Sequence, residues 1–361
     1  MDTIYVAGLQ SIKNIGSVTI RSLVGSFGSA ERVWQASVDD IRSTQVLTGQ
    51  AADEFVRRRS LVDINSLYEA LQRERVSVIS YWDDEYPLLL QGTYNPPAVL
   101  FYKGKLPPTE KTLAVVGSRK ATAYGKNVCA FLVEELAAAQ VCIVSGGARG
   151  IDSASHESAL KQGSTTIAVL ASGLDTVYPP ENKNLFCRIA EQGALVSEYP
   201  LGVQPLAQNF PARNRIISGM ARGVLVIEAA ERSGTLITAD FSLEEGRDVF
   251  AVPGSIFSSS SKGTNQLLRQ GAIPVTSALD ILQEYDWLAP VKSELELVME
   301  CTLEEHCVLS VLSMETAQPL DMIIAKTRLP LSAVNMILLH LELSDYVKNI
   351  GNQQYIRCSR R

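Results

Sequence analysis

The sequence predicts an α/β fold, a Rossmann-like doubly wound and mainly parallel sheet, and three observations support this prediction. From residue 112 onward, short apolar runs alternate with segments of helical periodicity. The runs are nearly continuous stretches of Val, Ile, Leu and Ala, as expected for parallel strands that are buried on both faces. Several runs end in Gly-containing turns directly before a helical segment, which is the order that a βαβ unit requires.

The expected elements follow one another between residues 111 and 288. We expect strands at Leu113–Gly117, Val141–Ser145, Thr165–Ala171, Ala194–Ser197, Gly223–Ala229 and Val249–Val252. Between them we expect helices at Gly125–Ala139, Asp152–Gly163, Glu181–Gln192 and Ile237–Gly246. We therefore assign residues 111–288 to one Rossmann-like domain.

Two different segments precede this domain. Residues 1–65 are expected to form a small helical domain, similar to a SAM or helix-hairpin-helix module, because the turn Ile12–Gly16 precedes the helical segment Thr19–Phe27. That turn has two interpretations, contact with a phosphate backbone or packing against the rest of the chain. Residues 66–110 are rich in proline, which neither continues a helix nor fits a central strand, so we expect an extended connection packed on the core.

Residues 296–361 are expected to form a winged-helix-like domain. Three segments have helical spacing, and a hairpin signal around Gly351 follows them. The segments are Glu304–Ser313, Leu320–Thr327 and Leu331–Leu343. Residues 280–361 carry 7 Lys and Arg against 12 Asp and Glu, so we expect a structural or protein-docking role and no recognition of duplex DNA by this domain.

Composition excludes several classes of protein. The start of the sequence does not resemble a signal peptide and no apolar run has the length of a membrane helix, so we expect a cytoplasmic protein without a membrane partner. Six scattered cysteines and 3 histidines predict neither a disulfide framework nor a metal site, and no cofactor is expected. Residues 111–271 carry 15 Lys and Arg against 14 Asp and Glu, whereas the whole chain has a net charge of −6. A local basic site is therefore possible in the middle of the chain.

Candidate ligand-binding residues follow the expected strands, where doubly wound sheets bind ligands. After the first strand, Gly117 permits close approach, Ser118 offers a hydroxyl and Arg119 can form a forked contact with a phosphate. The second strand leads into Ser145, Gly146, Gly147 and Arg149, whose loop and following helix favour an anion.

Two polar residues follow this second loop. Asp152 is expected to cap the following helix. His156 has either a packing role or a contact with DNA.

Two further loops complete the candidate site. Phe210 can stack on a base, and the run Arg213, Asn214 and Arg215 forms a compact contact set for phosphates or bases. As an alternative, Arg213 or Arg215 forms an ion pair with a glutamate and stabilises the sheet. The last loop, before the helix of residues 237–246, contains three small residues: Ser233, Gly234 and Thr235.

The order of these motifs resembles that of the DNA-processing protein A (DprA/Smf) family over roughly residues 80–277. The matching blocks are GSRKATAYG, SGGARGIDSASHESAL, GLDTVYPPENKNLF, SEYPLG, FPARNRIISG, EAAERSGTLITA, FAVPG and GTNQLLRQGAIPV. The resemblance implies a non-catalytic, homodimeric protein that binds and protects single-stranded DNA and helps to load the recombinase RecA during natural transformation. It implies DNA contacts at Gly146 and Gly147, with Lys183 as a further contact. It also implies contacts at four arginines and one asparagine: Arg119, Arg149, Arg213, Asn214 and Arg215. One departure, Asp345 in place of a family glycine, concerns the geometry of the wing.

The expected dimer contact follows the last core strand. Apolar residues there are typical of an association surface, and a two-fold interface would use the same surface on both chains. The candidates are Ile256, Leu267 and Ile273, among the apolar residues Phe257, Leu268 and Val275. As an alternative, these side chains fill the core.

An enzyme acting on nucleotides is the main alternative function. Lysine-decarboxylase-like phosphoribohydrolases have a similar fold and use the motif Pro-Gly-Gly-x-Gly-Thr-x-x-Glu. The most similar stretch here, Glu231–Thr238, lacks the leading Pro-Gly-Gly and has Thr238 in place of the glutamate. A dehydrogenase is disfavoured because no G-x-G-x-x-G turn follows the first strand.

Overall fold

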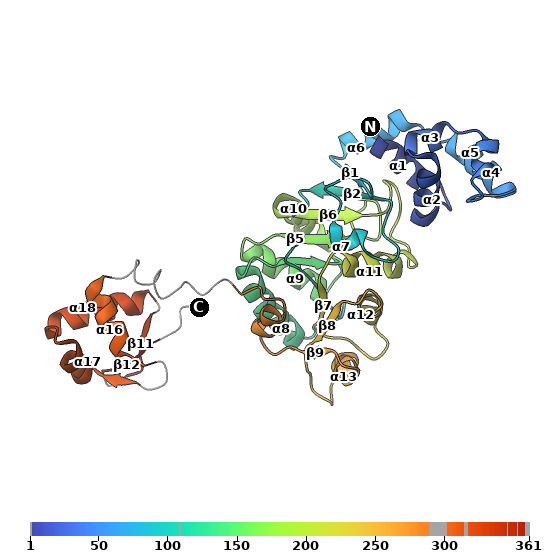
Figure 1. The fold of residues 1–361 in the computed structure, drawn as a ribbon. Helices are drawn as coiled ribbons and strands as arrows, with labels where there is room; N and C mark the ends of the chain where they lie inside the picture. Colours follow the sequence, from blue (N-terminus) through green and yellow to red (C-terminus); the bar gives the residue numbers. More distant parts are fainter. Residues whose placement is uncertain are drawn as a thin grey trace. The chain divides into compact units, whose positions relative to one another are not determined.

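The computed structural model describes residues 2–107, 110–288, 302–313, 317–344, 346–351 and 353–357. The chain forms two compact units, residues 1–287 and 288–361 (Figure 1). The strands of the first unit are β1 (Ser77–Ser80), β2 (Val99–Gly104), β3 (Thr112–Val116), β4 (Cys142–Ser145), β5 (Thr166–Val169), β6 (Ala194–Ser197), β7 (Gly223–Val226), β8 (Asp248–Ala251) and β9 (Ile273–Pro274).

The helices of the first unit precede, connect and follow these strands. They are α1 (Asp2–Gln10), α2 (Ser17–Phe27), α3 (Ala30–Gln35), α4 (Val38–Ser43), α5 (Gln50–Arg59), α6 (Ile64–Arg73), α7 (Leu88–Gln91), α8 (Ala123–Ala138), α9 (Ile151–Lys161), α10 (Lys183–Gln192), α11 (Asn209–Gly219), α12 (Gly234–Glu244), α13 (Lys262–Arg269) and α14 (Ala278–Glu284). Two 3₁₀ turns, η1 (Pro180–Asn182) and η2 (Ser259–Ser261), precede α10 and α13.

The nine strands form one sheet in the order β1-β2-β6-β5-β4-β3-β7-β8-β9. All pairs from β6 to β9 are parallel, and only β1 and β2 are antiparallel to their neighbours. The predicted doubly wound, mainly parallel sheet is confirmed. All six predicted core strands occur within three residues of their expected bounds.

Helices cover both faces of the sheet. Because side chains alternate along a strand, Ala114 and Val116 of β3 pack with apolar residues of α11, α12 and α13 on one face. Leu113 and Val115 pack with α8, α9 and α14 on the other face. Burial on both faces explains why these strands are apolar at every position.

Residues 66–110 differ from the expected extended connection. They contain most of α6, the short α7, and the strands β1 and β2, which extend the sheet beyond β6. Three of the prolines lie outside the strands, since Pro87 precedes α7, and Pro96 and Pro97 precede β2. The prolines therefore predicted the loops correctly, but the strands β1 and β2 between these loops were not predicted.

The helical N-terminal segment packs against the sheet within the same unit. Ser17, the first residue of α2, is 5% exposed and donates from Oγ to Oε1 of Glu198 at 2.7 Å. The same Oγ accepts a hydrogen bond from the backbone N–H of Ala98 at 2.9 Å. The turn at Ile12–Gly16 thus leads directly into a buried contact, which favours the packing interpretation of this segment.

The second unit contains a winged-helix domain, as predicted. Its helices are α16 (Leu303–Val311), α17 (Leu320–Thr327) and α18 (Leu331–Leu343), and its strands are β10 (Gln318–Pro319), β11 (Val347–Asn349) and β12 (Gln354–Arg357). β11 and β12 pair as the wing, and β10 pairs with β12. Asp345 and Asn352 lie outside the described residues. No single described helix is long and apolar enough to cross a membrane, and α17 and α18 meet that test only as a pair bent by 112°.

Candidate nucleic-acid interface

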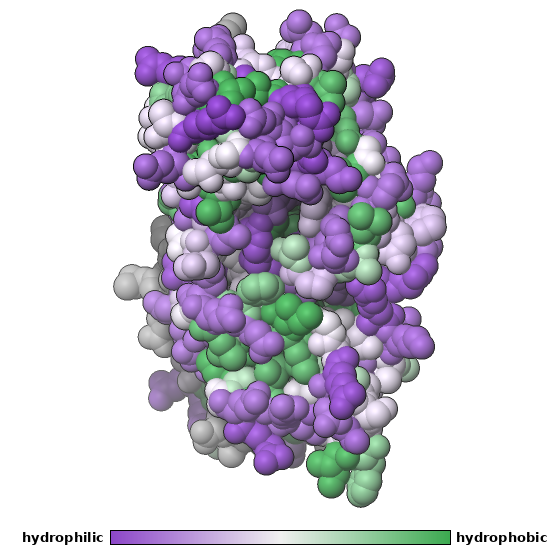
Figure 2. All heavy atoms as spheres, turned by 90° about the vertical axis from the view of Figure 1, so that its right-hand side faces the viewer, coloured by the Kyte–Doolittle hydropathy of each residue, from purple (hydrophilic) through white to green (hydrophobic). Residues whose placement is uncertain are grey.

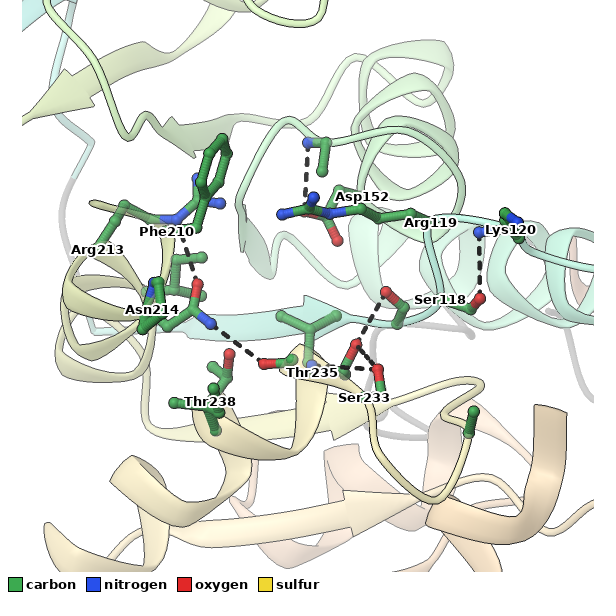
Figure 3. A pocket seen from close by; sticks show the side chains of 18 of the residues that line it. Ser118, Arg119, Lys120, Asp152, Phe210, Arg213, Asn214, Ser233, Thr235 and Thr238 are labelled. Carbon is green, nitrogen blue, oxygen red and sulfur yellow. Dashed lines mark hydrogen bonds between the residues drawn. The ribbon is translucent and has the colours of Figure 1, made fainter. Parts of the chain in front are cut away.

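A pocket of about 690 Å³ opens where the winding of the sheet changes direction. The chain passes from β3 to β4, β5 and β6 in one direction, and from β7 to β8 and β9 in the other. The adjacent carboxyl ends of β3 and β7 are therefore the switch point at which such sheets bind ligands. Residues from both of these ends line the pocket (Figure 3).

The loop after β3 is held by its backbone. Gly117 is buried, and a Cβ atom there would collide with Ile151 at the start of α9. The close approach that was predicted at Gly117 is therefore the approach of helix α9 to this loop. Ser118 donates from its N–H to the carbonyl of Glu228 at 2.8 Å and accepts at its own carbonyl from the N–H of Ile151 at 3.2 Å. These bonds fix the loop while the next two side chains, Arg119 and Lys120, are exposed at the pocket.

One face of α11 forms the opposite wall of the pocket. Phe210, Arg213, Asn214 and Ile217 line it at intervals of three and four residues, the spacing of a single helix face. The guanidinium carbons of Arg119 and Arg213 lie 4.8 Å and 5.9 Å from the centre of the Phe210 ring. The Tyr178 ring meets Phe210 edge to face at 5.7 Å.

Arg213 is a buried cation in this wall. It is 3% exposed, and its Nη1 donates to the carbonyl of Gly146 at 2.6 Å and to that of Val169. Burial lowers the pKa of its guanidinium to about 10, so the group stays protonated at neutral pH. Arg213 therefore joins α11 to the ends of β4 and β5 through carbonyl oxygens and not through an ion pair with a glutamate.

Arg215 and Arg149 lie outside the pocket lining. Arg215 forms an ion pair with Glu198 and donates from Nη1 to the carbonyl of Asn95 at 2.5 Å, with 17% of its side chain exposed. For this arginine the expected alternative, an ion pair that stabilises the sheet, is what the structure contains. Arg149 forms an ion pair with Glu181 at the surface.

The start of α12 closes the third side of the pocket. Ser233 caps the helix, because its Oγ accepts from the N–H of Thr235 at 3.2 Å. Thr235 donates from Oγ1 to the carbonyl of Gly117 at 3.0 Å, and Asn214 donates from Nδ2 to that of Gly234 at 3.3 Å. The loops after β3 and β7 and helix α11 are thus connected around one cavity.

Asp152 is a buried acid in the pocket wall. It is 6% exposed, and burial raises the pKa of its carboxyl to about 6. Its predicted capping role is wrong, because Gly150 occupies the N-cap of α9 and Asp152 lies within the first turn. His156 is fully buried, its Nδ1 lies 2.7 Å from Oγ1 of Thr166, and burial lowers its pKa to about 3. His156 therefore packs as a neutral side chain and does not line the pocket.

The structure brings together nine of the predicted site residues around this pocket. They are Gly117, Ser118, Arg119, Phe210, Arg213, Asn214, Ser233, Gly234 and Thr235. Six others do not line it: Ser145, Gly146, Gly147, Arg149, Lys183 and Arg215. Among the lining residues that were not predicted as contacts, Lys120 and Arg232 add cations and Tyr178 adds an aromatic ring. Each of the two cations directly adjoins a predicted residue in the sequence.

The chain matches two family models. Residues 77–286, more than half of the sequence, match the model described as DNA recombination-mediator protein A. Residues 298–351 match the DprA winged helix domain. The chain belongs to the DNA recombination-mediator protein A family.

Relatives in this family are similar over most of their length. The chain is 44% identical over 234 residues to the DNA processing protein DprA of Streptococcus pneumoniae, covering 64% of this chain and 82% of that protein. It is 42% identical over 283 residues to protein Smf of Escherichia coli, covering 76% and 75%. The X-ray structure of Streptococcus pneumoniae DprA has a TM-score of 0.69 at 38% identity, covering 78% of this chain and 98% of that one.

One further structure in this family concerns DNA. A structure of DNA processing protein A from Helicobacter pylori, which gives insights into its single-stranded DNA binding mode, has a TM-score of 0.53 at 29% identity. The match covers 58% of this chain and 95% of that one.

The pocket differs chemically from a phosphoribohydrolase site. Thr238, at the position of the hydrolase glutamate, lies in the pocket lining and is 1% exposed. Among the described residues, no group of three or more His, Cys, Asp or Glu side chains has the arrangement of a metal site.

The expected dimer residues separate into exposed and buried ones. Ile256 is 78% exposed and Ile273 is partly buried against the core. Leu267 of α13 is 4% exposed and packs in the core, which is the alternative expected for these apolar side chains. Figure 2 shows the side of the molecule that carries α12, with apolar side chains gathered in its middle and lower parts.

Proposed function

We propose that this chain binds single-stranded DNA in the pocket between β3 and β7. The observation that carries the proposal is the set of three exposed cations, Arg119, Lys120 and Arg232, that line one pocket together with the aromatic ring of Phe210. None of the three has an ion-pair partner among the described residues. Cations for phosphates beside a ring for bases are what sequence-tolerant single-strand binding requires. The single-stranded DNA binding of the Helicobacter pylori relative supports this proposal.

Each wall has a separate role in this proposal. Arg119 forms a forked contact with a phosphate, which a lysine cannot reproduce. The start of α12, capped by Ser233, adds backbone N–H groups and the positive end of a helix dipole. Phe210, with Tyr178 at its edge, stacks on a base. Since phosphate contacts and stacking do not read base edges, we expect little sequence preference.

We further infer that the bound strand is protected and passed to the recombinase RecA during DNA uptake. The description of the family as a recombination mediator supports this inference. The test is the rate at which RecA assembles on single-stranded DNA coated with single-strand-binding protein. The wild-type chain should shorten the lag and Arg119→Ala should not. An unchanged lag with the wild-type chain would refute the RecA role.

We infer no phosphoribohydrolase activity at this site, because Thr238 stands where the hydrolase motif has its glutamate. The acid in the pocket wall, Asp152, belongs to α9 and not to that motif. Nucleoside monophosphates incubated with the chain should release free base only at the rate of the buffer blank. Release above that rate, abolished by Thr235→Ala, would restore the enzyme interpretation.

We also propose that the chain is a homodimer joined through the first unit. Ile256 and Leu243, 78% and 57% exposed, are apolar side chains available for this contact. Sedimentation of the full chain should give a dimer, and Ile256→Glu or Leu243→Glu should shift it to the monomer. A monomeric wild-type chain at micromolar concentration would contradict the proposal.

A further inference from the structure

A second pocket of about 410 Å³ adjoins the first on the same two loops. Thr122 lines the second pocket two residues after Lys120, which lines the first. Glu228 lines the second pocket two residues before Ala230, which lines the first. A polymer that leaves the first pocket along these loops therefore meets the second, whose volume is within the usual range for ligand sites.

The mouth of the second pocket carries an anchored aromatic ring. Tyr124, in the first turn of α8, is 52% exposed, and its hydroxyl donates to the carbonyl of Pro253 at 3.2 Å. This bond fixes the far end of the side chain and leaves the ring accessible. Serine and threonine residues form much of the remaining wall: Thr122, Ser255, Ser258 and Ser261. Hydroxyl groups of this kind donate to and accept from the polar edge of a base.

The second pocket is unsuited to a phosphate. Glu228 is 2% exposed and accepts hydrogen bonds from the N–H and Oγ1 of Thr122, at 2.9 Å and 2.6 Å, and from Oγ of Ser260 at 3.2 Å. Its charge in the wall repels an anion. Lys120 precedes the lining residue Thr122 by two positions, and Lys262 directly follows the lining residue Ser261. Both lysines are exposed and have no ion-pair partner in the part of the chain that the structure describes. The neutral base is therefore the part of a nucleotide that fits inside, with its phosphates near the lysines.

We propose that the second pocket is a further nucleotide subsite, which takes a base of the strand held in the first pocket and stacks it on Tyr124. This inference rests on the proposed binding of single-stranded DNA. It makes the binding site longer than the switch-point pocket and extends it along the loop after β3 toward α8.

The test is the affinity of the full-length chain for oligothymidylates of increasing length. The variant is Tyr124→Ala, and the control is Tyr68→Ala on α6, which removes a ring of similar exposure, 55%, outside both pockets. The shortest oligonucleotides should bind wild type and Tyr124→Ala equally. Longer ones should bind Tyr124→Ala about tenfold more weakly, the loss expected for one stacked base. Tyr124→Phe, which keeps the ring, should retain most of the affinity, and Tyr68→Ala should match wild type at every length.

A second variant leaves the ring intact. Ser255→Leu narrows the pocket at an exposed position and should cause the same length-dependent loss. Equal affinities of wild type and Tyr124→Ala at all lengths would overturn the subsite. An equal loss at all lengths would also overturn it, because Tyr124 would then act on the first pocket. Failure of the wild-type chain to bind oligothymidylates of any length would instead contradict the proposed function itself.

Discussion

The guanidinium carbon of Arg119 lies 4.8 Å from the centre of the Phe210 ring, so a cation from the loop after β3 covers an aromatic side chain of α11. An exposed cation–π pair of this kind stabilises by only about 0.5–1 kcal/mol. Both partners are therefore easily released to a ligand, the guanidinium to a phosphate and the ring to a base. This pair is the centre of the proposed interface (Figure 3).

Arg119→Ala should weaken binding of single-stranded DNA by about 1.5–3 kcal/mol, the range for a hydrogen bond to a charged group. Thermal unfolding should be unchanged, because the side chain is exposed and has no ion-pair partner among the described residues. Arg119→Lys should recover part of the loss, since it keeps the charge without the fork. The matched control is Arg149→Ala, which removes an exposed arginine outside the pocket. An equal loss in the control would show that the effect is general electrostatics.

Phe210→Ala should weaken binding by about 1–3 kcal/mol through loss of a stacked base. The loss should be similar for oligonucleotides of different sequence, because every base presents an aromatic face. Phe131→Ala, which removes a 52% exposed ring on α8 outside the pocket, is the control. Fluorescence anisotropy at a fixed salt concentration measures the DNA affinity of both variants. Unchanged affinity for Phe210→Ala would remove stacking from the account.

Binding of an oligothymidylate should tighten as the pH falls through about 6. Burial raises the pKa of Asp152 to about 6, so the pocket loses a negative charge below that value. His156 does not account for such a step, because burial lowers its pKa to about 3. Asp152→Asn should abolish the step and bind at high pH as the wild type does at low pH. If the affinity of Asp152→Asn rose by the same amount as the pH fell through about 6, the pH dependence would belong to another titrating group.

The same carboxyl should also affect stability. Its folded-state pKa lies above its ordinary value of 3.8, so the folded protein binds more protons than the unfolded chain between these values. The contribution of Asp152 to stability is therefore greatest below about pH 4 and is lost as the pH rises through about 6. Urea unfolding of wild type and Asp152→Asn across this range should differ most above pH 6, where the variant should be the more stable.

Arg215→Ala should destabilise the fold by about 3 kcal/mol or more, because it leaves Glu198 buried without its cation. Arg149→Ala, which breaks an exposed ion pair, should change stability by less than about 1 kcal/mol. The double variant Arg215→Met/Glu198→Gln should recover much of the loss. A fully stable Arg215→Ala that no longer binds DNA would return Arg215 to the interface.

The sequence predicted the central sheet well because its strands are buried on both faces. Such strands are apolar at every position, and a run such as Leu113–Gly117 is distinctive. The edge strands β1 and β2 were missed, because their short runs lie among prolines that indicated only the loops. Asp152 was assigned to a cap by residue type, although a positive-φ glycine, Gly150, occupies that position.

The arginines of the site were harder to distinguish from sequence. Arg213 and Arg215 belong to one motif, but residues that are two positions apart on a helix lie on different faces. Arg213 therefore lines the pocket, and Arg215 reaches Glu198 and Asn95 instead. Lys120 and Arg232 were missed because the identity of a lysine or arginine does not reveal whether it has an ion-pair partner in the fold. Only the assembled loops reveal that these two cations line the same pocket as Phe210.

The most direct test of the central claim compares single-stranded with duplex DNA of the same length, across several salt concentrations. The account predicts tighter binding of the single strand, because a pocket with an aromatic wall accepts unstacked bases and a duplex does not expose them. The logarithm of the affinity should fall linearly with the logarithm of the salt concentration, and the slope should be shallower for Arg119→Ala, which has one fewer phosphate contact. Equal or tighter binding of the duplex by the wild-type chain would contradict the account.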